Sequence, residues 1–372
     1  MKILICNSSL VNLAGSELHC LELAIYYQEQ GHEVLLASLE VGGEIAAEMR
    51  SKQLSSKLIS ELTESDEWDI IWTHHISCFH AVHIERKLKA RHHVHGVLSV
   101  TEPLEAPPIP KDLAPDFESF LILCNSKMTL DYVKELIPST IDTCVFFNVC
   151  REPSGRKGVF CHDECNPTNI AIVSNHVPYE LRKLAQRARR FGTSVDIFGL
   201  QYERKRITQE FLSIYDVVIS IGKTVQYCMA EGVPVFVYDH FGGPGWLSKQ
   251  NLERAEYFNF NGKCTRNKRS ARRLWAQVLD GYSNSLSELE HFQNHAMIQY
   301  EISSQIRQKI PNSGYLKAHQ LISDDEQGSK IAKHLDYLSR NTRCNKVKTR
   351  PFLSKLRKEM KKIKRSVVGF EQ

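Results

Sequence analysis

The stretch ISIGKTVQYCMAEGVPVFVYDHFGGPGWL, residues 219–247, decides the fold class of this 372-residue chain. A short apolar run ends at Ile221, Gly222 opens a helical segment that stops at Gly232, and a second apolar run ends at Tyr238. Strand, helix and strand in this order form a βαβ unit, the building block of parallel sheets.

The same alternation extends outward from this stretch through most of the chain. Apolar runs rich in β-branched residues alternate with longer segments of helical periodicity, such as 16–30, 179–191 and 224–231. The predicted strands are 2–6, 33–38, 69–73, 93–98, 120–124, 144–148, 170–174, 194–198, 217–221 and 235–238. We therefore predict an α/β protein with two Rossmann-like, doubly wound parallel-sheet domains that face a cleft.

The domain boundary is expected where the alternation stops. Residues 150–168 combine Pro153, Gly155, Gly158 and Pro167 with charged residues, as a linker does. We predict one Rossmann-like domain over 1–155, a second over 166–330 and a basic helical tail over 331–372.

Composition indicates an ordinary globular protein, with 42% hydrophobic and 24% charged residues. No apolar run approaches the roughly 18 residues of a spanning helix, and residues 1–7 read as a strand rather than a signal peptide. The eleven cysteines are an odd number and are scattered. They predict reduced thiols and a cytoplasmic protein.

The tail carries the positive charge of the chain. The net charge is +5, yet residues 343–365 alone contain eleven Lys and Arg residues and a single acid, Glu359. Apolar residues recur every three or four positions among them, which predicts an amphipathic helix on an anionic membrane surface. A solvated helix docked on the protein, or a nucleic-acid-binding segment, is the alternative; no nucleic-acid partner is expected.

Two glycine-containing turns are candidate anion sites. In the first, Gly15 and Ser16 precede a helix, whose free N–H groups and dipole attract phosphate. The alternative is that Gly15 only provides the backbone angles of the turn.

The second turn is richer in donors. Gly222, Lys223 and Thr224 open a helix at one strand end, and Gly242, Gly243 and Gly245 are expected to open another at the adjacent strand end. Both helix N-termini, with the lysine and the hydroxyl, would bind a phosphate. The alternative is that the glycines build tight turns and Lys223 is solvated. A Walker P-loop is excluded by its glycine spacing.

These motifs together resemble glycosyltransferases of the GT-B fold, notably the retaining family 4 enzymes and related bacterial polysaccharide glycosyltransferases. The resemblance spans about residues 1–260 and is carried by Gly15-Ser16-Glu17, Gly31-His32-Glu33-Val34, Val94-His95-Gly96, Asn125-Ser126, Asp216-Val217-Val218, 229–235 and Asp239-His240-Phe241-Gly242-Gly243. It implies an acceptor-side N-terminal domain, a donor-binding C-terminal domain and a nucleoside diphosphate sugar as co-substrate.

The resemblance also suggests roles for individual residues. It implies donor contacts from the second domain, and His95 on the acceptor side. Lys223 is the candidate for stabilising the leaving diphosphate. His74, His75 and Glu102 are further acceptor-side candidates, and each histidine has an alternative role as a hydrogen-bonded core residue. The donor-binding candidates are Gly15, Ser16, Asn175, Gly222, Lys223, Thr224, Gln226, Asp239, Gly242, Gly243 and Gly245.

The chain departs from family 4 at its two glutamates. Ile219 and Tyr227 stand at those positions, with Gln226 beside the second. The basic pair after the first strand of the second domain is replaced by Ser174-Asn175-His176. Ribose and phosphate contacts must therefore differ, and the stereochemical outcome is open.

A metal site is not expected. Seven histidines fall within residues 74–95, but His-His-x4-His-x2-His lacks the zincin spacing and Cys161-His162-x2-Cys165 lacks a second pair. We predict no cofactor apart from the nucleotide sugar.

The sequence leaves three functions open. The first is a glycosyltransferase that builds bacterial surface polysaccharide on a glycan or lipid-linked acceptor, peripheral on the inner face of the plasma membrane. The second is a catalytically silent GT-B protein that binds nucleotide or glycan. The third is a nucleotide-sugar epimerase.

Overall fold

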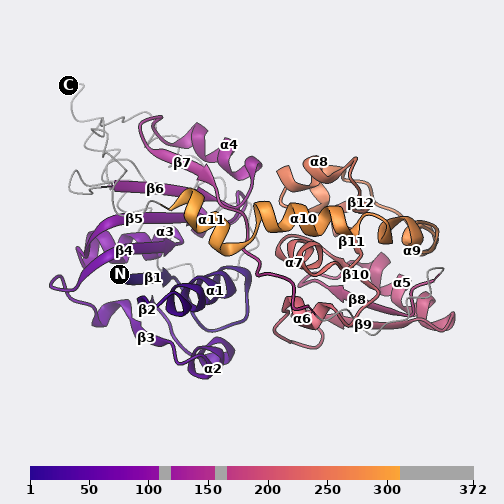
Figure 1. Cartoon of the computed structure of the whole chain (residues 1–372), viewed down its shortest axis with the longest axis horizontal. Coiled ribbons are helices and arrows are strands. Elements are labelled where there is room, and N and C mark those ends of the chain that lie inside the picture. Colours follow the sequence, from indigo (N-terminus) through magenta and orange to yellow (C-terminus); the bar gives the residue numbers. More distant parts are fainter. Residues whose placement is uncertain (109–118, 156–165, 311–372) are drawn as a thin grey trace, which may run out of the picture. The chain divides into compact units, whose positions relative to one another are not determined.

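The computed structural model describes residues 1–108, 119–155 and 166–310, which form two compact units with one sheet each (Figure 1). The first unit comprises the described parts of Met1–Cys124 and Thr129–Cys144. The second comprises Asn125–Met128 and the described residues from Val145 onward. The predicted tail over 331–372 and much of the predicted linker lie outside the described residues.

The first unit alternates strands with helices along the chain. Its elements are β1 (Lys2–Asn7), α1 (Gly15–Glu29), β2 (Glu33–Ser38), α2 (Gly43–Ser51), β3 (Ser55–Leu58), η1 (Ile59–Glu61), β4 (Glu67–His74), α3 (Ile76–His80), η2 (Ala81–Glu85), β5 (Lys89–Val97), η3 (Pro103–Glu105), β6 (Ser119–Cys124), α4 (Lys127–Leu136) and β7 (Asp142–Val145).

The first sheet has seven strands in the order β3-β2-β1-β4-β5-β6-β7. Neighbouring strands from β3 to β6 are parallel. The order runs outward from β1 to β3 and then restarts on the other side of β1 with β4, as in a Rossmann fold. Parallel strands need crossover connections that cover both faces, and the strands β1 and β4 accordingly contain runs of fully buried residues.

The second unit continues the alternation. Its elements are β8 (Asn169–Val173), α5 (Tyr179–Arg190), β9 (Ser194–Phe198), α6 (Gln209–Leu212), β10 (Val217–Ser220), α7 (Lys223–Glu231), β11 (Val235–Asp239), β12 (Gly242–Trp246), α8 (Leu252–Tyr257), η5 (Gly262–Cys264), α9 (Ala271–Leu286), α10 (Leu289–Gln299) and α11 (Ile302–Lys309).

The second sheet has five strands in the order β12-β11-β10-β8-β9. Successive residues of its strands enter two separate cores. Ile170 and Ile172 pack with residues of α5 and α9, whereas Ala171 packs with residues of α7 and α10. The sheet is therefore covered by helices on both faces, and the predicted α/β architecture with two sheets is confirmed.

Two strands differ from the prediction. The edge strand β3 was missed because all four of its residues, Ser55–Leu58, are exposed and carry no hydrophobic alternation. The strand β12 replaces a predicted helix and is antiparallel to β11, so the second sheet is mixed rather than wholly parallel. Of the helices in the described ranges, none combines the length and apolar character needed to cross a lipid bilayer.

A buried histidine packs tightly between two strands of the first unit. His74 has no exposed surface, and β4 pairs it with Gly96 of β5. A Cβ atom on Gly96 would lie 2.3 Å from His74 Cε1, far inside van der Waals contact. On its other side the His74 ring meets the ring of His19 of α1 edge-on, with centroids 5.1 Å apart. Glycine at position 96 therefore provides the space that the imidazole occupies.

We expect Gly96→Ala to destabilise the protein by about 1–3 kcal/mol, because the methyl group forces the His74 ring out of its packing. Urea denaturation measures the change. Gly15→Ala is the matched control, because a Cβ there meets nothing within 4 Å. Equal stability of the two variants would contradict the packing argument.

The free energy of unfolding should fall in mild acid. Burial lowers the pKa of His74, His93 and His95 from 6.5 to about 3, so the folded state keeps all three neutral. Below about pH 6.5 the unfolded chain binds protons that the folded state excludes, and stability decreases as the pH falls towards 3. Each histidine should cost about 2 kcal/mol between pH 8 and pH 5. Urea unfolding at these two pH values tests this, and equal stability would contradict it.

Candidate active site

The strand order of the first unit reverses between β1 and β4. In open α/β sheets, ligands bind at the carboxyl ends of the strands beside such a reversal. Here β1 ends at Asn7 and is followed by Ser8, while β4 ends at His74 and is followed by His75. Ser8 and His75 therefore occupy the position where the topology favours a ligand site.

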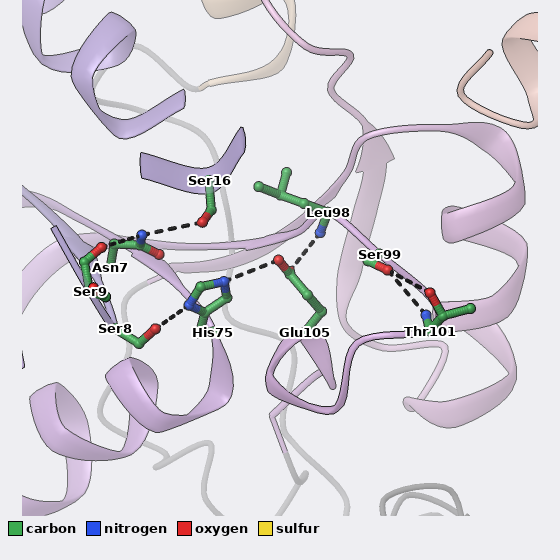
Figure 2. Close-up of polar contacts among 9 residues, drawn as sticks. All are labelled: Asn7, Ser8, Ser9, Ser16, His75, Leu98, Ser99, Thr101 and Glu105. Atoms are coloured by element: carbon green, nitrogen blue, oxygen red, sulfur yellow. Dashed lines mark hydrogen bonds and ion pairs between the residues drawn. The ribbon is translucent and has the colours of Figure 1, made fainter. Parts of the chain in front are cut away.

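A chain of polar contacts joins three residues at this position (Figure 2). The Ser8 hydroxyl lies within hydrogen-bonding distance of His75 Nδ1. The other ring nitrogen, Nε2, lies 3.2 Å from Glu105 Oε1. The His75 and Glu105 side chains are only 13% and 5% exposed. The three groups thus form a hydroxyl, imidazole and carboxylate relay that is largely screened from water.

The backbone around the relay fixes its geometry. Glu105 is the last residue of the 3-10 helix η3, and its Oε2 accepts a hydrogen bond of 2.8 Å from the Leu98 N–H. Ser99 and Thr101 tighten the loop before η3 through a hydrogen bond of 3.1 Å from the Thr101 N–H to Ser99 Oγ (Figure 2). His75 has a φ of +68°, in the left-handed region that costs non-glycine residues about 1 kcal/mol or more. Such strain is characteristic of functional positions.

The relay suits proton transfer from a hydroxyl group. A carboxylate beside Nε2 favours the tautomer that carries its proton there, which leaves Nδ1 as the acceptor nitrogen. A proton taken up by Nδ1 would convert His75 to imidazolium, and the Glu105 carboxylate would stabilise that charge. His75 and Glu102 were both predicted from the sequence as acceptor-side candidates, whereas the carboxylate that contacts His75 is that of Glu105.

Asn7 adds an unused acceptor at the end of β1. Its Nδ2 donates to the Ser9 carbonyl at 2.8 Å and to Ser16 Oγ at 3.3 Å. Its buried Oδ1 has no hydrogen-bond partner among the described residues. Buried polar atoms are rarely left unpaired, so Asn7 Oδ1 retains the capacity to accept one further hydrogen bond.

The turn before Gly15 and Ser16 binds an internal carboxylate. The Glu17 carboxylate, only 4% exposed, accepts backbone hydrogen bonds from Val11, Asn12 and Ala14 at 2.9–3.1 Å. These amides belong to the turn that was expected to bind a diphosphate. An internal carboxylate thus occupies these three amides, and Ser16 Oγ accepts from Asn7 Nδ2 at 3.3 Å. Phosphate binding at Gly15 and Ser16 stays a prediction.

His95 lies in the core rather than on a strand-end surface. It has no exposed surface, its Nδ1 lies 2.9 Å from Thr73 Oγ1, and its ring meets Phe79 edge-on. Burial lowers its pKa to about 3. The structure therefore agrees with the alternative role of a core residue, and His75 provides the imidazole of the site.

The strand order of the second sheet also reverses, between β8 and β10. Asn175 is exposed just after β8, and Gly222 follows β10 with a φ of +59° before α7 begins. Lys223 and Thr224 are the first two residues of α7, and the Lys223 ammonium lies 5.5 Å from the centroid of the Tyr227 ring. The helix N-terminus, a cation and a hydroxyl are thus together at a strand-end edge, as predicted for a phosphate site.

Gln226, a predicted donor contact, lies in the interior of the second unit. It is fully buried, and its Oε1 accepts a hydrogen bond of 2.8 Å from Asn148 Nδ2. Asn148 also donates to Asn259 Oδ1 at 3.0 Å. Gln226 therefore connects α7 to two other segments of the second unit.

The glycines of residues 242–245 form β12 and no helix N-terminus. A Cβ atom on Gly243 would lie 2.1 Å from the Val237 carbonyl oxygen, and one on Gly242 would lie 2.5 Å from the Asn267 backbone. Gly242 and Gly245 have positive φ values of +99° and +90°. These glycines allow the close antiparallel return against β11, so the predicted second helix N-terminus at this edge is wrong.

The Asp239 carboxylate also accepts hydrogen bonds from the backbone near this turn. Its Oδ1 accepts from the Phe241 N–H at 2.6 Å and its Oδ2 from the Gly262 N–H at 3.0 Å. It is 2% exposed. The observed role of Asp239 is therefore to hold η5 against the β11–β12 turn.

No metal centre is visible among the side chains that the structure describes. There, no group of three or more His, Cys, Asp or Glu residues converges to hold a metal ion. Of the histidines of residues 74–95, His75 belongs to the relay, and His80 and His92 lie beside Glu85 and Ser119. His74, His93 and His95 are buried. Whether the protein acts without a metal stays a prediction.

No protein-family model matches the sequence, and no curated protein matches it. Solved structures do resemble it. A glycosyltransferase from Rickettsia africae ESF-5 is 11% identical over 92% of this chain and 99% of its own, with a TM-score of 0.49. An alpha-glucosyltransferase in complex with UDP is 12% identical over 83% of this chain and 98% of its own, with a TM-score of 0.49.

Sucrose-phosphate synthase from Thermosynechococcus elongatus is 9% identical over 83% of this chain and 97% of its own, with a TM-score of 0.45. The activities in these three names are those of the neighbours and are not assigned to this chain by the similarity.

We expect Glu17→Gln to destabilise the protein by about 1–3 kcal/mol, because the uncharged amide weakens three charge-assisted hydrogen bonds from backbone N–H groups to a buried carboxylate. Urea denaturation measures the loss. Glu33→Gln, at an exposed position of the same unit, is the matched control and should change little. An effect of equal size in both variants would mean that Glu17 does not hold the turn.

Proposed function

We propose that this protein transfers a glycosyl group from a nucleoside diphosphate sugar to a hydroxyl group of an acceptor. The observation that carries the proposal is the contact of His75 with a hydroxyl on one ring nitrogen and a buried carboxylate on the other. Transfer to a hydroxyl requires a base for its proton, and this relay supplies one. The first unit thereby binds the acceptor.

The second unit is proposed to bind the donor diphosphate at the start of α7. Lys223, Thr224 and the first-turn amides of the helix offer positive charge and hydrogen-bond donors to phosphate oxygens. Asn175 is exposed at the neighbouring strand end and is the proposed polar contact there. These groups would stabilise the negative charge that the diphosphate gains as it leaves. We expect the transfer to proceed without a divalent cation.

The proposed reaction is a single displacement. The acceptor oxygen bonds to the anomeric carbon, its proton passes to His75 Nδ1, and the bond from the anomeric carbon to the diphosphate oxygen breaks with its electron pair leaving on the diphosphate. Such a displacement inverts the configuration at the anomeric carbon. The family 4 glutamates are replaced in this chain by Ile219 and Tyr227, which are buried core residues. This replacement supports a mechanism different from that of the retaining family 4 enzymes.

The acceptor is proposed to be a glycan or a lipid-linked sugar, as in bacterial surface polysaccharide synthesis. The unused Asn7 Oδ1 supports an acceptor with a further hydroxyl near the reacting one. A cytoplasmic location with peripheral membrane binding rests on the amphipathic sequence of the tail alone, and the tail lies outside the described residues.

We expect His75→Ala to lower kcat for transfer by about 100-fold or more, because it removes the base. Donor binding, measured as the thermal shift with nucleoside diphosphates and their sugars, should stay unchanged in this variant. Lys223→Ala should instead reduce the thermal shift as well as kcat, because Lys223 is proposed to contact the donor diphosphate. His80→Ala is the matched control, since His80 lies 3.5 Å from Glu85 in a more exposed histidine–glutamate pair.

Full activity of His75→Ala would remove the relay from the mechanism. Binding of a donor without turnover by the wild type would instead favour a silent nucleotide-binding protein. Conversion of the donor sugar without an acceptor would favour an epimerase.

A further inference from the structure

The base of the proposed reaction is already occupied by a side chain of the protein. Since Nε2 of His75 faces Glu105, Nδ1 is the ring nitrogen that an acceptor hydroxyl must reach. Ser8 places its own hydroxyl there (Figure 2). An acceptor therefore reaches the base only after the Ser8 hydroxyl has moved away.

The backbone on both sides of Ser8 is fixed by hydrogen bonds. Before it, Asn7 is the last residue of β1, and its side chain donates to the Ser9 carbonyl at 2.8 Å. After it, Leu10 donates to the Glu40 carbonyl at 2.8 Å, and the following turn is held by Glu17. Rotation about χ1 of Ser8 is therefore the movement that exposes Nδ1, and it needs only a change between staggered rotamers.

Water competes with the acceptor for any base in a glycosyl transfer. A water molecule on Nδ1 would lose its proton to His75 as an acceptor hydroxyl does, and its attack would hydrolyse the donor. A covalently attached hydroxyl has a high effective concentration at Nδ1 and displaces water from it. An acceptor that makes further contacts replaces the Ser8 hydroxyl more easily than a single water molecule does.

We propose that Ser8 is a positioning and specificity residue that caps His75 and suppresses hydrolysis of the donor in the absence of an acceptor. This inference rests on the proposed function, since it concerns whether the same donor is hydrolysed by water or transferred to the acceptor. Ser8 makes no bond to the substrate in either reaction. Its effect is on which hydroxyl reaches the base.

The test compares donor hydrolysis with transfer in four proteins. Ser8→Ala should raise the ratio of hydrolysis to transfer by about fivefold, the factor that corresponds to one hydrogen bond of ordinary net strength. Ser8→Thr retains the hydroxyl and should keep the ratio of the wild type. Ser9→Ala is the matched control at the adjacent serine, since only the Ser9 carbonyl takes part in the contacts described above. Release of nucleoside diphosphate with and without acceptor gives both rates, and urea denaturation verifies that each variant is folded.

An unchanged ratio in Ser8→Ala, an equal rise in Ser9→Ala, or loss of both reactions in Ser8→Ala would overturn the inference and leave the proposed function standing. Absence of turnover in the wild type itself would overturn the proposed function, and the inference with it. A fold defect in Ser8→Ala leaves Ser8→Thr and Ser8→Gly to decide, because Ser8→Gly removes the same hydroxyl.

Discussion

The reversal of strand order beside β1 is the constraint on which the candidate site depends. The connection that leaves β1 leads to β2 and the connection that leaves β4 leads to β5, in opposite directions, so the carboxyl ends of β1 and β4 are not covered by one common crossover. Ser8 and His75 come from these two strand ends, and parallel pairing in register keeps the ends level. The second sheet repeats the arrangement between β8 and β10, where Asn175 and Lys223 follow the two strands.

Sequence periodicity predicted most of this architecture, because buried parallel strands are continuous apolar runs and their bounds are visible in the residues. The strands β2 and β9 match their predicted ranges, 33–38 and 194–198. The prediction of a second helix N-terminus failed because a glycine can either open a helix or allow the close approach of a neighbouring strand. Gly222 precedes a helix, whereas Gly243 allows a neighbouring strand to pack closely. Only the contact with the Val237 carbonyl, which the structure reveals, distinguishes these two roles of glycine.

The site itself was predicted in part, for reasons that concern contacts distant in sequence. His74, His75 and His95 lie at or near the carboxyl ends of adjacent strands and have the same residue type, yet two are buried and one contacts Ser8. The sequence alone does not show which of the three is at the surface. Successive residues of a strand point to opposite faces, so a shift of one position exchanges the interior for the surface. Glu105 was missed because a 3-10 turn places it, three residues after Glu102, beneath the Leu98 amide. The family 4 assignment and the membrane tail stay predictions.

Glu17 has a consequence for how such a fold can diversify. Its carboxylate fills a concavity of three backbone donors with an anion that the chain itself encodes. A change of one nucleotide in a glutamate codon can produce alanine or glycine, which would leave these three backbone N–H groups without their internal anion. The side chain of one residue therefore decides whether the three amides of this turn are paired inside the protein or left without their carboxylate.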